Sequence, residues 1–160
     1  MTFQKFLENW DMTELELDIN FLKMRWVPQT ADQNAAWELY VELLTRVTTQ
    51  ALPSEHGDEK TALESIYSLF PTTREIIKKH GKECINFAKI AIPVLNQIVR
   101  PFTAKWHGRS LTEAFEEPNR RQEFRQDLAH LQDKLTKYAR LLAGMARVED
   151  ITSLEAKNVS

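Results

Sequence analysis

The chain has 160 residues, of which 42% are hydrophobic and 28% charged, and its formal net charge at pH 7 is −2. The apolar content excludes a disordered chain, and four glycines and six prolines are too few for a collagen-like or low-complexity one. We therefore expect one globular domain that buries a sizeable core. The single cysteine, Cys84, excludes an intramolecular disulfide and a cysteine-based zinc site.

Two features of the sequence bear on where the protein resides. The start of the chain lacks a basic stretch followed by a long apolar run, which is the pattern of a secretory signal. The longest apolar stretch, residues 84–102, contains Lys89, Pro93 and Arg100, which a membrane-spanning helix would not tolerate. We expect a cytoplasmic protein that does not enter the membrane.

Residues 1–28 form an N-terminal extension that is either a strand or a short helix. Apolar and polar residues alternate strictly from Glu14 to Phe21, and again in the opposite phase up to Trp26, which is the period of a half-buried strand. Part of the same segment also fits the spacing of a helix, so both alternatives stay open.

A strand in this extension would need a partner strand. No other segment of the chain has the pattern of a strand, so the extension would pair with a second copy or with a sheet edge of another protein. We favour a homodimer, because Lys23 and Arg25 could pair with Glu14 or Glu16 of the second copy. The candidate partner-binding residues are Leu15, Leu17, Ile19, Phe21 and Trp26.

Residues 29–150 predict an all-α bundle of four main helices. The first helix covers residues 31–51, with a capping box at Thr30 and Gln33, and ends before Pro53. Its apolar face is predicted from residues spaced by three and four: Trp37, Tyr40, Leu44, Val47 and Ala51.

The second helix begins near residue 58 and is expected to break at Phe70, because Pro71 disfavours helical geometry in the residue before it. A new capping box that starts at Thr72 then opens a short helical segment. This segment ends at Gly81, which can adopt the left-handed closing conformation.

The third and fourth helices supply the centre of the predicted bundle. Residues 83–106 are apolar on most of the helix circumference, with kinks expected at Pro93 and Pro101. The fourth helix begins at Pro118 and carries a narrow apolar seam that should face another helix. The seam consists of Phe124, Leu128, Leu131, Leu135, Tyr138, Leu142 and Met145. Residues 151–160 are expected to form a frayed tail.

Charge is segregated along the chain. Residues 1–70 carry 5 basic and 12 acidic side chains, residues 71–109 carry 8 and 2, and residues 119–147 carry 7 and 3. The third helix ends and the fourth begins at one end of the bundle, where a helix N-terminus favours anions. The candidate anion-binding residues there are Arg100, Lys105, His107, Arg109, Arg120, Arg121 and Arg125.

This basic end has two interpretations. It is either a solvated surface balanced by Glu113, Glu116 and Glu117, or a site for phosphate, RNA backbone or an acidic partner. Trp106 beside it could stack on a nucleic-acid base or belong to the core.

Motifs for nucleotide, calcium or zinc binding are absent from the sequence, because so little glycine leaves no P-loop or dinucleotide fingerprint. The four histidines are scattered, and none has a His or carboxylate partner at the spacing that a helical metal site needs. We predict no metal and no cofactor.

Arg100 and His107 are separated by six residues, and this segment resembles the Arg and His motif of HEPN ribonucleases, which are small all-helical domains. Arg74 with His80 and Arg125 with His130 have similar spacings. The resemblance implies a metal-independent ribonuclease with Arg100 and His107 as catalytic residues. In that family His acts as general acid or base on the ribose 2′-OH and Arg stabilises the phosphorane.

The leading interpretation is a non-enzymatic helical-bundle interaction or accessory protein that binds a protein partner or a second copy of itself. The alternative is a HEPN-like ribonuclease or nucleic-acid-binding module that works through the basic end.

Overall fold

The structure is a computed structural model that describes residues 1–46, 48–50, 52, 58–110 and 114–153. Within these residues the chain is helical and has no named strand, which confirms the all-α class. The elements in chain order are α1 (Phe3–Asn9), α2 (Ile19–Lys23), α3 (Thr30–Leu44), α4 (Glu59–Tyr67), α5 (Leu69–His80), η1 (Gly81–Cys84), α6 (Ile85–Pro93), η2 (Val94–Val99), α7 (Arg100–Ser110), η3 (Ala114–Glu116) and α8 (Pro118–Ala146).

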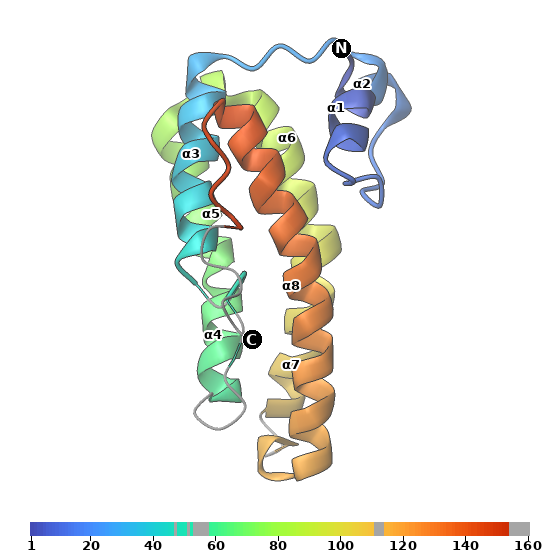
Figure 1. The fold of residues 1–160 in the computed structure, drawn as a ribbon, viewed down its shortest axis with the longest axis vertical. Helices are drawn as coiled ribbons and strands as arrows, with labels where there is room; N and C mark the ends of the chain where they lie inside the picture. The colour runs from blue at the N-terminus through green and yellow to red at the C-terminus, as the bar shows by residue number, and fades with distance from the viewer. Residues whose placement is uncertain (47, 51, 53–57, 111–113, 154–160) are drawn as a thin grey trace.

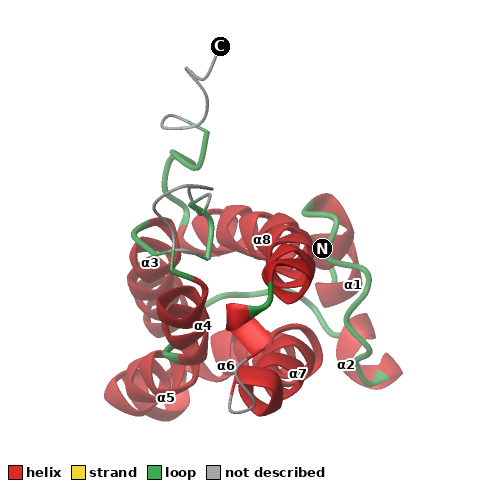
Figure 2. Ribbon diagram, turned by 90° about the horizontal axis from the view of Figure 1, so that it is seen from below, coloured by secondary structure: helices red, strands yellow, loops and turns green. Residues whose placement is uncertain are grey.

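Four rods of helix form the bundle. α4 and α5 follow each other as one rod, α6, η2 and α7 form a second, and α3 and α8 complete the set (Figure 1). α3 packs mainly on α8 and α5. Seen from below, the rods surround a common interior, and α1 and α2 lie outside it as a separate pair (Figure 2). The N-terminal extension is therefore attached to the side of the bundle.

α8 agrees closely with its sequence pattern. Pro118 occupies its first position, where the missing N–H would have had no partner, and Arg147 closes it with a left-handed φ of 58°. The predicted seam is buried along its whole length and faces the core: Phe124, Leu128, Leu131, Leu135, Tyr138, Leu142 and Met145.

The predicted central helix is present, but its backbone changes type along its length. Between Pro93 and Pro101 the backbone forms the π-helical segment η2, in which the N–H of Arg100 donates to the carbonyl of Leu95, five residues earlier. Each proline lacks an N–H and removes one bond from the regular ladder, which favours this local change. Most of the apolar positions are buried as expected, but Ile92 is 46% exposed.

α3 is shorter than the helix predicted over residues 31–51. Its N-cap is Gln29, one residue before the predicted Thr30, and the backbone N–H of Gln29 donates to the Asp32 carboxylate at 2.8 Å. The helix ends at Leu44. Val47, Ala51 and Pro53, which the prediction used for the last turns, lie outside the described residues.

A run of threonines explains the early end of α3. The hydroxyl groups of Thr48 and Thr49 donate to the carbonyl oxygen of Leu43 at 2.5 and 2.9 Å, and that of Thr45 donates to the carbonyl of Val41 at 2.8 Å. Such side-chain bonds occupy helix carbonyls and offer the backbone an alternative to another helical turn.

The buried face of α3 also differs from the prediction. Tyr40 is buried as expected, but Trp37 is 46% exposed, and the core face is formed by Ala36, Leu39 and Leu43 instead. The contacts of α3 with both α8 and α5 explain the difference, because they cover a side of the helix that does not include Trp37.

The break between α4 and α5 lies at Ser68, two residues before the predicted position at Phe70. Pro71 is tolerated in the first turn of α5, where the N–H that it lacks would not have been bonded within the helix. Thr72 lies inside α5 and does not start it. Gly81 is the C-cap of α5 as predicted and has a φ of +71°, which favours glycine, but its ψ of −159° differs from the predicted left-handed conformation.

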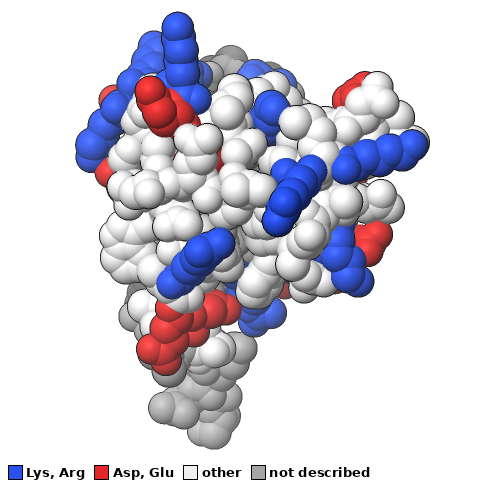
Figure 3. All heavy atoms as spheres, turned by 90° about the horizontal axis from the view of Figure 1, so that it is seen from above, with Lys and Arg blue, Asp and Glu red and all other residues white. Residues whose placement is uncertain are grey.

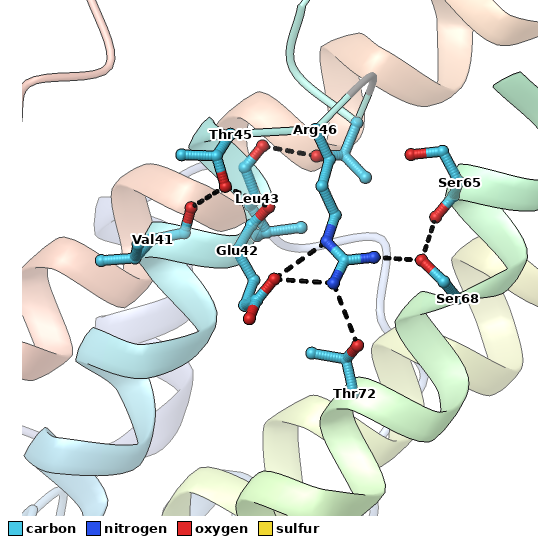
Figure 4. Close-up of polar contacts among 9 residues, drawn as sticks. Val41, Glu42, Leu43, Thr45, Arg46, Ser65, Ser68 and Thr72 are labelled. Carbon is cyan, nitrogen blue, oxygen red and sulfur yellow. Dashed lines mark hydrogen bonds and ion pairs between the residues drawn. The ribbon is translucent and has the colours of Figure 1, made fainter.

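Arg46 ties the end of α3 to this break (Figure 4). Its guanidinium is paired with Glu42 at 2.7 Å and donates to the hydroxyl groups of Ser68 and Thr72. The Ser68 hydroxyl in turn donates to the carbonyl of Ser65 at 2.6 Å. These hydrogen bonds provide partners for the Ser68 and Thr72 hydroxyls and for the Ser65 carbonyl at the junction of α4 and α5.

Of the two alternatives for the N-terminal extension, the strand is wrong and a short helix is present. The segment forms α2 and extended connections, and its only strand-like feature within the described residues is an isolated antiparallel bridge between Thr2 and Arg25. The N–H of Phe3 donates to the carbonyl of Met24 at 3.0 Å, and the N–H of Trp26 donates to that of Met1 at 2.8 Å. The first residues of the same chain therefore supply the backbone partner that the prediction assigned to a second molecule.

Candidate functional site

The predicted basic end is organised around one carboxylate. Glu123 on α8 is paired with Arg109 at 2.8 Å, with Arg120 at 3.2 Å and with Lys105 at 3.3 Å. Lys105 also contacts Asp127 at 2.6 Å. Hydrogen bonds from Arg109 and Lys105 lower the pKa of Glu123 from 4.5 to about 2. Three of the seven predicted cations are thus partly neutralised by acidic residues of the same bundle.

The other four residues of the set are not paired with Glu123 in the described part of the chain. Arg125 is paired with Glu59 of α4 at 3.0 Å, which joins α8 to α4. Arg100 lies over the ring of Phe70 at 4.7 Å, and His107 and Arg121 are exposed. Glu123 therefore engages three of the seven residues, whereas Arg125 and Arg100 have other partners.

Trp106 belongs to the core. Its side chain is fully buried, its ring packs against those of Phe115 and Phe124, and its indole N–H donates to Asp127 at 3.0 Å. The alternative in which Trp106 stacks on a nucleic-acid base is therefore wrong, because a base has no access to this ring.

Basic side chains are not confined to that end. The opposite end, viewed from above, carries Lys and Arg side chains among mostly uncharged ones (Figure 3). At the C-terminal end of α5, Lys79 is paired with Glu38 at 2.7 Å, and His80 contacts the same carboxylate at 3.1 Å. Burial alone would raise the pKa of Glu38, but these two hydrogen bonds outweigh it and lower the pKa.

A cleft of about 530 Å³ lies between α4 and α7. Its walls combine apolar and polar side chains: Lys60, Leu63, Glu64, Tyr67, Ser68, Pro71, His107 and Ser110. The ring of Tyr67 is 54% exposed and lies 6.3 Å from that of His107. The predicted second helix gave no indication of this cleft, because periodicity alone does not show which side of a helix its neighbours leave uncovered.

A second cavity of about 240 Å³ lies between the rod of η2 and α7 and the middle of α8. It is lined by Phe102 and Leu131 and by charged or polar groups of Lys105, Asp127 and His130. Because Lys105 and Asp127 already bind each other, this cavity offers fewer unused polar groups than the cleft between α4 and α7.

Four of the five predicted partner-binding residues pack on their own chain. Leu15 is buried, and Leu17, Phe21 and Trp26 are partly buried against the core. The ring of Trp26 stacks on Phe6 at 4.1 Å. Phe21 lies 4.1 Å from Phe3.

The remaining residue, Ile19, is 62% exposed. Glu14 and Glu16, which were expected to meet Lys23 or Arg25 of a second copy, also have partners within the chain. Glu14 is paired with Lys134 at 3.2 Å, and the backbone of Glu16 exchanges two hydrogen bonds with the side chain of Gln97.

The outer side of α3 presents large apolar side chains. Trp37 is 46% exposed and Val41 is 40% exposed, and residues four apart share one face of a helix. Tyr40 between them is buried, and its hydroxyl donates to Asp150 at 3.1 Å and accepts from the N–H of Ile151 at 2.7 Å. These bonds hold the described C-terminal segment beside α3, with the Ile151 side chain exposed.

Among the described residues, no three His, Cys, Asp or Glu side chains are grouped so that they could hold a metal ion. No helix in the described part of the chain is both long and apolar enough to cross a membrane. Comparisons with protein-family models, with curated proteins and with solved structures find no match to this chain.

Proposed function

We propose that the chain is a non-enzymatic interaction or accessory protein, and that it binds a protein partner or a second copy through the α3 face. We define the α3 face as Trp37 and Val41 with the neighbouring Ile151. The observation that carries the proposal is the exposure of Trp37 beside Val41, because tryptophan is enriched at the centre of protein interfaces.

The surroundings of the α3 face support this assignment. On the side toward α5, Glu38 and Glu42 follow Trp37 and Val41 in the sequence and are held in ion pairs with Lys79 and Arg46. An apolar centre with a polar, ordered rim is the usual anatomy of an interface.

The experiment compares two substitutions at equally exposed apolar residues. Trp37→Glu places a charge on the α3 face, and Ile92→Glu places one on α6, where the replaced side chain is also 46% exposed. Self-association is measured by sedimentation velocity over a concentration series, and binding of other proteins by using each variant as bait. We expect Trp37→Glu to weaken the association at least about tenfold and Ile92→Glu to leave it unchanged. Equal binding by both variants, or no association of the wild type with anything, would contradict the proposal.

A HEPN-like ribonuclease is the second candidate, and one observation favours it. Two of the three Arg and His pairs have a member that is engaged by a carboxylate: Arg125 is paired with Glu59, and His80 contacts Glu38. In the third pair, neither Arg100 nor His107 forms an ion pair with a described residue. Arg100 lies over Phe70, and His107 lies beside Tyr67 on the preceding helix, so both point to the same side of α7. They are about 10 Å apart along the helix axis.

The ribonuclease candidate has its own test. Cleavage of single-stranded RNA is measured in the presence of a metal chelator with the wild type, Arg100→Ala and His107→Ala. A ribonuclease of this kind would lose cleavage in both variants while circular dichroism shows an unchanged fold. Absence of cleavage by the wild type would remove this candidate and leave the interaction protein.

A further inference from the structure

The cleft between α4 and α7 is separate from the α3 face and has no role in the proposed interaction function, although His107, a catalytic candidate of the ribonuclease alternative, is among the residues that line it. Its volume of about 530 Å³ lies within the range of small-molecule sites, and its walls mix apolar surface with a few polar groups, as such sites do. We propose that it binds a small aromatic molecule that carries both a carboxylate and an ammonium group, as a free aromatic amino acid does.

The apolar part of the cleft fits a flat ring. Leu63 is buried and lines the cleft together with Pro71. Tyr67 contacts Phe70 at 5.7 Å and His107 at 6.3 Å, yet more than half of its surface stays exposed. Aromatic rings gain free energy from offset or edge contacts with another ring beyond the burial of area. An aromatic ligand would supply the contact that the Tyr67 ring lacks.

The charged part of the cleft fits two opposite charges. Lys60 and Glu64 both line it and stand one helical turn apart on α4. Neither forms an ion pair with another described residue, and a Lys that precedes a Glu by four residues is the less favourable order for pairing within a helix. The ammonium of Lys60 would bind the ligand carboxylate, and the carboxylate of Glu64 would bind the ligand ammonium group.

The cleft also offers uncharged hydrogen-bonding groups. The hydroxyl of Ser110 lines it and donates to the carbonyl of His107 at 2.8 Å, so its oxygen can still accept a hydrogen bond. The site thus has a partner for each part of an aromatic amino acid. Tyr67 contacts its ring, Lys60 binds its carboxylate, and Glu64 binds its ammonium group, while the Ser110 hydroxyl can accept a further hydrogen bond.

Four indole compounds separate these contributions. L-tryptophan carries both charges, 3-indolepropionate lacks the ammonium, tryptamine lacks the carboxylate, and indole lacks both. Binding of each compound to the full chain is measured by calorimetry and by ligand-observed NMR. The proposal requires L-tryptophan to bind more tightly than the other three.

Three variants assign the binding to named side chains. We expect Tyr67→Ala to weaken the binding of all four compounds about tenfold. Lys60→Met should weaken the binding of tryptophan and indolepropionate only, and Glu64→Gln should weaken the binding of tryptophan and tryptamine only. Each loss of affinity should be about threefold to fivefold, because these charges are exposed. His130→Ala, in the 240 Å³ cavity, and Trp37→Glu, on the α3 face, serve as controls and should change nothing.

Three results would overturn the proposal. They are binding of none of the compounds at millimolar concentration, binding of indole as tight as that of tryptophan, and unchanged affinities in Lys60→Met and Glu64→Gln. Tyr67→Leu provides a second test of the ring contact if Tyr67→Ala loses its helical circular dichroism. Because Trp37 takes no part in this site, failure here leaves the proposed interaction function standing, and the reverse also holds.

Discussion

The indole ring of Trp10 lies directly against Gly144 in the last turns of α8. A β-carbon at Gly144 would stand 2.4 Å from Cζ2 of Trp10, which is closer than any real contact of this kind. Nearby, Asp11 is paired with Lys137 at 2.8 Å. The absence of a side chain at Gly144 is thus what allows the N-terminal extension to dock on the bundle.

We predict that Gly144→Ala destabilises the protein although alanine is the better helix former. The methyl group would displace the Trp10 ring, and overpacking of this kind costs about 1–3 kcal/mol, which exceeds the gain in helix propensity of about 1 kcal/mol. The free energy of unfolding in urea measures the effect. In a Trp10→Ala background the same substitution should stabilise the protein by about 1 kcal/mol. The same sign in both backgrounds would show that Trp10 does not require the glycine.

Asp32 is predicted to be the most important buried carboxylate of the bundle. It is fully buried and accepts hydrogen bonds from the backbone N–H groups of Gln29 at 2.8 Å and Phe87 at 2.9 Å, which joins the starts of α3 and α6. Asp32→Ala leaves a buried N–H without a partner, so the free energy of unfolding should fall by about 2–3 kcal/mol. Asp58→Ala removes the exposed cap of α4 and should cost only about 1 kcal/mol. An equal loss in the two variants would contradict the structural role of Asp32.

Stability should decrease in acid because of Glu123. Its pKa is lowered in the folded state from 4.5 to about 2, so the unfolded state binds the proton more readily between these values. The stabilisation by this carboxylate is present above about pH 4.5 and is lost as the pH falls toward 2. The melting temperature of Glu123→Gln should therefore be lower than that of the wild type at neutral pH and approach it at low pH. Parallel pH profiles of the two proteins would disprove the role of Glu123.

Two buried tyrosines are predicted to respond oppositely to removal of the hydroxyl group. The Tyr138 hydroxyl is buried and has no hydrogen-bond partner among the described residues, so Tyr138→Phe should raise the free energy of unfolding by about 1 kcal/mol. The Tyr40 hydroxyl binds Asp150 and the N–H of Ile151, so Tyr40→Phe should lower it by about 1 kcal/mol. Urea denaturation of both variants provides the measurement. A loss of stability in Tyr138→Phe would show that its hydroxyl has a partner.

The sequence by itself determined the parts of the fold that depend on local periodicity. The seam of α8 and its start at Pro118 were predictable, because a heptad pattern over several turns buries the same residues against any neighbouring helix. The positive φ of Gly81 was predictable for a similar reason, since a helix end needs a residue that tolerates this conformation.

The charge pattern predicted where basic residues are dense but not what they do. Lys105, Arg109 and Arg120 were expected at one end of the bundle, yet Glu123, which pairs with all three, follows them in the sequence, and only its spacing of three from Arg120 is a local signal of that role. Arg125 is paired with Glu59, which is 66 residues away. Ion pairs over such separations depend on which helices become neighbours.

Tertiary packing decided the remaining features. Trp37 fits the period of a core face, but α8 and α5 cover a different side of α3 and leave it at the surface. The alternation from Glu14 to Phe21 fits a strand, but Lys134 of α8 and Gln97 of η2 give Glu14 and Glu16 partners within their own chain. The sequence specifies which residues can be buried, whereas the relative positions of distant segments determine which residues are buried. The reason is that apolar side chains and backbone polar groups find their partners on whatever surface lies closest in space.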